Sequence, residues 1–145
     1  MVAEPGTKNR LIEKVAEIYD WLDEQIRDNR KPAGRCKVCG KCCDFDKYDH
    51  RLFVTSPELI YLTENLGKRI RPMTTGRCPY QAENKCSIYK YRFCGCRIFC
   101  CSGDADFQSG LSESTLAMFR QVCIDFDIPY RYTDLAAALN SVANV

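Results

Sequence analysis

The sequence predicts a small, mainly α-helical protein in which three to four helices surround an irregular, cysteine-rich region. Apolar side chains recur at helical spacing near both ends of the chain, whereas the 11 cysteines of this 145-residue sequence lie almost entirely between those ends. An apolar share of 46% and a charged share of 28% are ordinary for a folded protein. We expect a single domain, 1–145, because a chain of this length commonly builds one core.

The first predicted element is an amphipathic helix over residues 7–30, in which apolar side chains alternate with mixed, mostly acidic ones. The apolar positions are Leu11, Ile12, Val15, Ile18, Tyr19, Leu22 and Ile26. An acidic polar face is typical of a helix packed on a core, because helices that lie on membranes carry basic residues there. We expect Pro32 and Gly34 to end this helix, since the residue before a proline disfavours helical conformation and glycine permits a turn.

A second helix is expected over residues 56–66. Ser56 is suited to the N-cap, and Pro57 and Glu58 are suited to the first turn. Gly67 is suited to ending the helix, because glycine tolerates the backbone conformation found just beyond a helix.

Further helices are expected in the C-terminal region, residues 112–145. Apolar residues at helical spacing predict a helix from about Glu113 to Asp125, with Cys123 on its apolar side as a small buried hydrophobe. Thr133 and Asp134 are suited to capping a short, alanine-rich helix over residues 135–142.

Charge and segment composition narrow the classes of function. A net charge of +2 does not indicate a dedicated nucleic-acid binder, and the chain shows neither a signal peptide nor an apolar run long enough to cross a bilayer. We therefore expect a cytoplasmic protein without membrane attachment. Cytoplasmic thiols are kept reduced, so the odd count of 11 cysteines favours metal binding over a disulfide framework.

The cysteine-rich region, residues 35–101, begins with a motif that we call the cysteine knuckle. The pattern CxxCGxCC places Cys36, Cys39, Cys42 and Cys43 within one short loop, and the two-residue spacers allow several sulfur atoms to converge on one centre. No helical or alternating pattern competes with this arrangement between Arg35 and Tyr48. The fold class is thus one of helices around a metal-binding region.

More cysteines follow between residues 68 and 110, a turn-rich stretch where we expect only a short strand or turn around residues 87–91. These cysteines are Cys78, Cys86, Cys94, Cys96, Cys100 and Cys101. One zinc ion or one cubane cluster normally takes four protein ligands, so the sequence leaves open two centres, or one centre with surplus or redox-active thiols.

Four segments together resemble the YkgJ or CxxCxxCC family, which is described as a zinc- or iron-chelating domain. They are Cys36 to Cys43, Arg77-Cys78-Pro79-Tyr80, Cys86-Ser87-Ile88-Tyr89 and Cys96-Arg97-Ile98-Phe99. The resemblance implies a ligand set of Cys36, Cys39, Cys42, Cys43, Cys78, Cys86 and Cys96, with Cys100 as a weaker match. The family usually has Arg-Pro where this chain has Arg92-Phe93, and Cys94 and Cys101 are additions to its pattern.

The identity of the bound metal stays open at this point, with iron favoured. The spacing of Cys36, Cys39 and Cys42, completed by Cys78-Pro79, is that of bacterial 4Fe–4S clusters, although CxxC pairs serve structural zinc equally well. The single histidine, His50, is a less favoured ligand because thiols are plentiful.

Three functions are consistent with these features. The leading one is a metal-binding protein, and the partner we expect is the metal ion or cluster itself. The second is a redox or protein-modifying component, since the resemblance extends to flagellin lysine methylases, which contain a similar cysteine region. The third is a zinc-stabilised module that binds a protein or, less favoured, a nucleic acid. No motif identifies catalytic residues.

Overall fold

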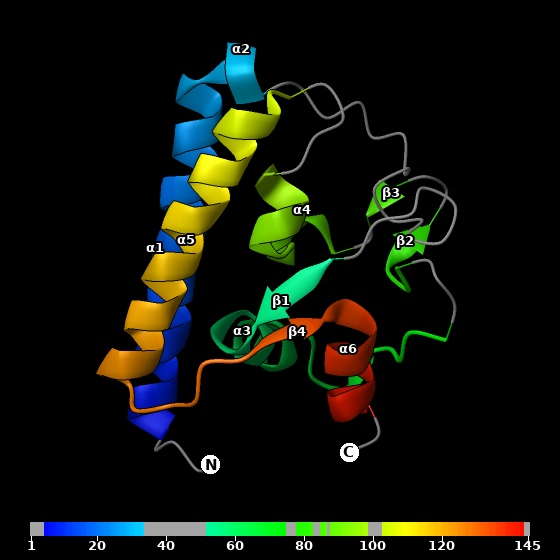
Figure 1. The fold of residues 1–145 in the computed structure, drawn as a ribbon. Helices are drawn as coiled ribbons and strands as arrows, with labels where there is room; N and C mark the ends of the chain where they lie inside the picture. Colours follow the sequence, from blue (N-terminus) through cyan, green and yellow to red (C-terminus); the bar gives the residue numbers. More distant parts are fainter. Residues whose placement is uncertain are drawn as a thin grey trace.

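Two long helices form one side of the computed structural model, which describes residues 5–33, 52–74, 78–82, 85–86, 88–98 and 103–143 (Figure 1). Helix α1 spans Pro5–Asp28 and helix α5 spans Ala105–Asp125, and the two lie side by side along their length. The prediction of a mainly α-helical protein is confirmed by these elements.

The first hydrophobic cluster fills the space between α1, α5 and the short helix α4, Cys94–Ile98. Its buried members are Leu11, Val15, Ile18, Tyr19, Leu22, Cys94, Ile98, Phe119 and Val122. Phe119 is completely buried, and its ring meets the ring of Tyr19 edge to face with centroids 6.0 Å apart. The apolar stripe predicted for the N-terminal helix is therefore its packing face, as expected for a helix on a core.

The expected stop of the first helix at Pro32 is wrong. Helix α1 ends at Asp28, and a separate helix α2, Arg30–Ala33, follows and includes Pro32. Proline is tolerated there because the first-turn amides of a helix have no intrahelical acceptor in any case.

Helix α3 spans Ser56–Leu66, but its N-cap lies one residue before the predicted Ser56. The N-cap is Thr55, whose hydroxyl accepts a hydrogen bond from the Glu58 amide, while the Glu58 carboxylate accepts one from the Thr55 amide. This reciprocal capping box fixes the first turn. Gly67 ends the helix as predicted, with a φ of 55° that glycine adopts without strain, and a 3-10 turn η2, Gly67–Arg69, follows.

The structure contains two short antiparallel strand pairs, and the sequence analysis predicted neither pairing. Strand β1, Phe53–Thr55, pairs with strand β4, Tyr132–Asp134, so that Val54 lies opposite Thr133. In the middle of the chain, β2, Gln81–Ala82, pairs with β3, Lys85–Cys86, and a 3-10 turn η3, Tyr89–Tyr91, comes next. The short strand or turn expected around residues 87–91 corresponds to this 3-10 turn.

The C-terminal region differs from the prediction at one boundary. Helix α5 starts at Ala105, well before the predicted Glu113, because the Asp104 carboxylate caps it by accepting a 2.8 Å hydrogen bond from the Phe107 amide. The turn-rich stretch thus ends earlier than expected, and it also contains helix α4. The final helix α6, Leu135–Ala143, is confirmed.

The second hydrophobic cluster lies under β1, α3 and α6 and reaches into the cysteine-rich region. Its buried members are Val54, Leu62, Leu66, Met73, Tyr80, Phe93, Leu135, Ala138 and Leu139. Cys78 and Cys96 are among the partly buried residues packed against it. Helix α4 therefore has one cysteine, Cys94, in the first cluster and another, Cys96, beside the second.

Candidate metal centre and the buried network beside it

The predicted metal ligands are described only in part. The four cysteines of the knuckle, Cys36, Cys39, Cys42 and Cys43, lie outside the described residues, as do Cys100, Cys101 and His50. The backbone of Cys86 is described in β3, whereas its side chain is not. Cys78 and Cys96 are the two candidate ligands whose side chains are described, and both are half-buried.

Two segments of the cysteine-rich region carry a cysteine that packs against the second cluster. Cys78 and Cys96 pack against it from different parts of the chain, and the buried ring of Tyr80 lies within it. The β2–β3 pairing places the Cys86 backbone opposite Gln81, the residue after Tyr80. This topology turns Cys86 back toward the segment that carries Cys78.

The four described cysteine side chains form no disulfide: Cys78, Cys94, Cys96 and Cys123. Among the residues that the structure describes, no group of three or more His, Cys, Asp or Glu side chains lies close enough together to hold a metal ion. A centre that used Cys78 and Cys96 would thus need ligands from the residues beyond those described.

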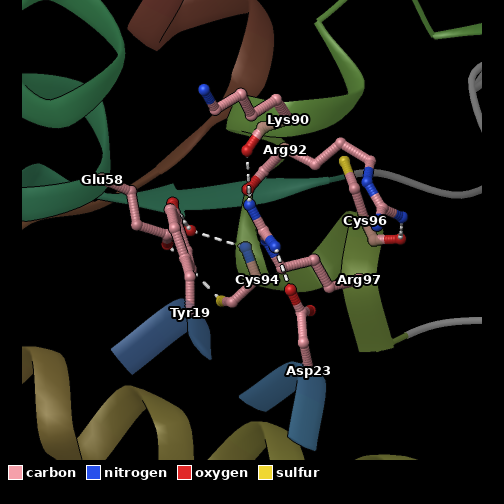
Figure 2. A network of polar contacts seen from close by, with 8 residues as sticks. All are labelled: Tyr19, Asp23, Glu58, Lys90, Arg92, Cys94, Cys96 and Arg97. Atoms are coloured by element: carbon pink, nitrogen blue, oxygen red, sulfur yellow. Dashed lines mark hydrogen bonds and ion pairs between the residues drawn. The ribbon is translucent and has the colours of Figure 1, made fainter. Parts of the chain in front are cut away.

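The two cysteines of α4 have opposite surroundings. In Figure 2 the Cys94 sulfur points toward Glu58, whereas the Cys96 sulfur points away from it. Gly95 between them is packed so closely that an added Cβ atom would lie 2.5 Å from Leu52 Cδ1. A larger residue at this position would therefore need the Leu52 side chain to shift.

A completely buried carboxylate, that of Glu58, is the centre of a polar network between the two clusters. Its Oε2 atom accepts hydrogen bonds from the Tyr19 hydroxyl at 2.9 Å and from the Cys94 amide at 2.6 Å (Figure 2). Its Oε1 atom accepts from the Thr55 hydroxyl at 3.0 Å, the Thr55 amide at 3.2 Å and the Cys94 thiol at 3.5 Å. This set of donors fits an ionised carboxylate, which can only accept hydrogen bonds.

The surroundings of Glu58 favour the neutral forms of Cys94 and Tyr19. Burial raises the pKa of the Cys94 thiol well above its ordinary value, and the neighbouring Glu58 charge raises it further. Burial and the same charge also raise the pKa of the Tyr19 hydroxyl well above its ordinary value. Cys94 is therefore a protonated hydrogen-bond donor, which is opposite to the thiolate that a nucleophilic or redox-active cysteine requires.

Arg97 extends the network from α4 to α1 and to the turn before α4. Its guanidinium forms a 2.7 Å ion pair with Asp23 and lies 4.1 Å from the centroid of the Tyr19 ring. It also donates hydrogen bonds to the backbone carbonyls of Arg92 and Lys90, at 2.9 and 3.0 Å (Figure 2). With only 6% of its side chain exposed, Arg97 fixes the orientation of α4 against α1.

Sequence reasoning missed this network, although one signal for part of it was present. The spacing of Thr55 and Glu58 is that of a capping box, which predicts the local hydrogen bonds of Glu58. Nothing local predicts that Tyr19 and Cys94 also bind Glu58, because they come from distant parts of the chain.

Cys123 lies where the sequence predicted it, buried on the apolar side of α5. Its sulfur is 3.7 Å from the Ser56 hydroxyl and 4.0 Å from the Pro129 carbonyl oxygen. Burial raises the pKa of this thiol, which is consistent with a packing role.

No protein-family model, curated protein or solved structure matches this chain. The CxxCxxCC resemblance therefore stays an expectation that depends on the motifs themselves. Within the described ranges, none of the helices combines the length and the hydropathy needed to cross a bilayer.

Proposed function

We propose that this chain is a metal-binding protein whose cysteine knuckle and later cysteines together hold an iron–sulfur cluster or zinc. The proposed ligands are Cys36, Cys39, Cys42, Cys43, Cys78, Cys86, Cys96 and Cys100. The observation that carries the proposal is the convergence of Cys78 and Cys96, distant in sequence, on one hydrophobic cluster, with the β2–β3 pair returning the Cys86 backbone toward the segment that carries Cys78.

The chemistry of these donors fits a soft metal. Thiolates select zinc and iron–sulfur clusters over hard cations, and half-buried sulfur atoms at the edge of an apolar cluster can reach a metal while restricting water. We do not include Cys94 in the proposed ligand set, because its neutral thiol donates a hydrogen bond to the Glu58 carboxylate.

The short elements around these cysteines support a structural role for the metal. Strands β2 and β3 have two residues each, and the turn η3 has three. Such short hairpins are marginal by themselves in water, whereas a bound metal contributes its binding free energy to folding. The residues of the chain would supply the thiolates and orient them, and the metal would supply the cross-link between segments.

Of the two metals, we favour iron in a 4Fe–4S cluster, because Cys78 is followed by Pro79 as in bacterial cluster proteins. A redox or protein-modifying activity receives no support from Cys94, whose thiol is buried and protonated.

The test is anaerobic purification of the full chain, followed by metal analysis, acid-labile sulfide analysis and a visible absorption spectrum. We expect a brown protein that contains iron and sulfide. A colourless protein with stoichiometric zinc would keep the metal-binding proposal and reject the cluster. Folded protein without bound iron or zinc would overturn the proposal.

A further inference from the structure

We infer that a groove beside the end of α3 binds an acidic segment of a partner protein. This basic groove is a surface cavity of about 270 Å³ that is lined by three cationic residues, Lys68, Arg69 and Arg71, and by apolar ones. The apolar side chains that line it include Ile70, Tyr80 and Ile88. The inference does not depend on a metal being bound.

The positive charge of the groove is not neutralised within the described part of the chain. Lys68, Arg69 and Arg71 are all exposed, and no acidic side chain is among the lining residues described. None of the ion pairs between described residues involves these three cations, whereas Lys8 and Lys14 elsewhere each pair with a glutamate. Three adjacent cations that have no acidic partner among the described residues attract an anionic partner.

Neutral backbone acceptors hold two of these cations in position. Arg69 donates to the carbonyls of Asn65 at 2.9 Å and Leu66 at 3.3 Å, and Arg71 donates to the Pro79 carbonyl at 3.4 Å. These bonds restrict the side chains but leave their charge available. Binding of a carboxylate would therefore cost less side-chain entropy than it would on freely rotating arginines.

The mixture of groups favours a protein segment over other anions. Carboxylates pair well with arginine, and the apolar wall formed by Ile70 and Ile88 suits an aliphatic side chain next to them. A nucleic-acid strand would need exposed aromatic rings for stacking, and the Tyr80 ring is only 3% exposed. A membrane surface would suit a protruding face better than a hollow one.

The test uses the full chain, purified anaerobically, and a fluorescein-labelled peptide of alternating glutamate and leucine, and binding is followed by fluorescence anisotropy. We expect binding that weakens as salt rises to about 0.15 M, because charge attraction drives it. The double variant Lys68→Glu/Arg71→Glu should weaken binding by about tenfold or more. Lys68→Glu alone, at an exposed position, should weaken it less while leaving the thermal unfolding unchanged.

The matched control is Lys14→Glu/Arg131→Glu, which changes the net charge equally at two exposed positions outside the groove. We expect this control to bind the peptide nearly as well as the wild-type chain does. Equal weakening in both double variants, or no binding by the wild-type chain, would overturn the inference. It would also be overturned if a single-stranded oligonucleotide or anionic vesicles bound through Lys68 and Arg71 while the peptide did not.

Discussion

Cys94 and Cys96 lie on the same turn of α4 and yet belong to two different kinds of structure. Cys94 is 3% exposed, packs in the first cluster and donates to Glu58. Cys96 is half-buried against the second cluster, together with Cys78. Cysteine density alone therefore does not identify ligands, because one of these two neighbouring thiols is part of a conventional core.

The same contrast separates the two clusters. The first is built on long helices whose apolar faces explain their packing, with α1 and α5 extending over 24 and 21 residues. The second reaches a region of two-residue strands and short turns. If the proposed metal is present, it organises the second region as apolar burial organises the first, and four predictions examine this difference.

The largest effect is expected from exchanging the two cysteines of α4 for serine, one at a time. Cys96→Ser should lower the bound metal and disorder the cysteine-rich region, because structural metal binding contributes on the order of 10 kcal/mol to folding. Cys94→Ser should retain the metal, since serine can still donate to Glu58. Metal analysis and hydrogen exchange measure both results. Loss of metal from Cys94→Ser, with none from Cys96→Ser, would reverse the assignment.

Removal of the Glu58 carboxylate should have the next largest effect. Glu58→Ala leaves the buried donors of Tyr19, Thr55 and Cys94 without their acceptor, so we expect a loss of about 3–5 kcal/mol in unfolding free energy. Denaturant titration measures this loss. The control Glu64→Ala removes only an exposed ion pair with Lys8 and should cost less than about 1 kcal/mol. Similar costs for the two variants would show that the network is not stabilising.

Gly95→Ala should reduce stability by no more than about 1 kcal/mol, because the new methyl group would lie 2.5 Å from Leu52 Cδ1 and the flexible Leu52 side chain must shift to admit it. Thermal unfolding measures the loss. Adding Leu52→Ala makes room for the methyl group, so the double variant should lose less stability than the sum of the two single variants. Strict additivity would mean that the contact between Leu52 and residue 95 is not tight.

The smallest effect is expected in the pH dependence of stability. The pKa of Tyr19 is raised in the folded protein, chiefly by burial, so the unfolded chain releases this proton first as the pH rises above about 10. Its contribution to stability is complete below that pH and is lost above it, by up to about 1.4 kcal/mol per pH unit. In unfolding measured at several alkaline pH values, Tyr19→Phe should show a shallower decline than the wild-type chain.

The less buried Tyr61 provides the control for this experiment. Burial also raises the pKa of Tyr61, but less strongly and without a contribution from the Glu58 charge, so Tyr61→Phe should change the alkaline decline less than Tyr19→Phe does. An equal change from both variants would show that the Glu58 charge has no part in the effect.

Sequence periodicity predicted α1, which carries a continuous apolar stripe, and placed Cys123 correctly in the core, whereas capping residues and alanine content predicted α6. Periodicity did not predict the start of α5, because residues 105–112 have few large apolar side chains. The Asp104 N-cap is the feature that marks this start. Periodicity also missed β1 and β4, because three-residue strands are too short for an alternating pattern to be recognised.

At the candidate site, the sequence predicted ligand types and spacing and could not predict which thiols would be enclosed. Cys94 and Cys96 have the same local context, and only the positions of Glu58 and Tyr19 distinguish them. The sequence could not predict the burial of Glu58 either, since a glutamate in the first turn of a helix is ordinarily solvated. These properties depend on contacts between distant segments.

The pairing of β1 with β4 makes the beginning of α3 depend on residues synthesised much later. The Ser56 amide donates to the Arg131 carbonyl at 2.9 Å, and the Leu135 amide donates to the Leu52 carbonyl at 2.8 Å. During translation, α1 can form as soon as it leaves the ribosome. Strand β1, in contrast, cannot pair with β4 until residues 132–134 have emerged from the ribosome. During that interval its exposed backbone is open to pairing with other nascent chains or to protection by a chaperone.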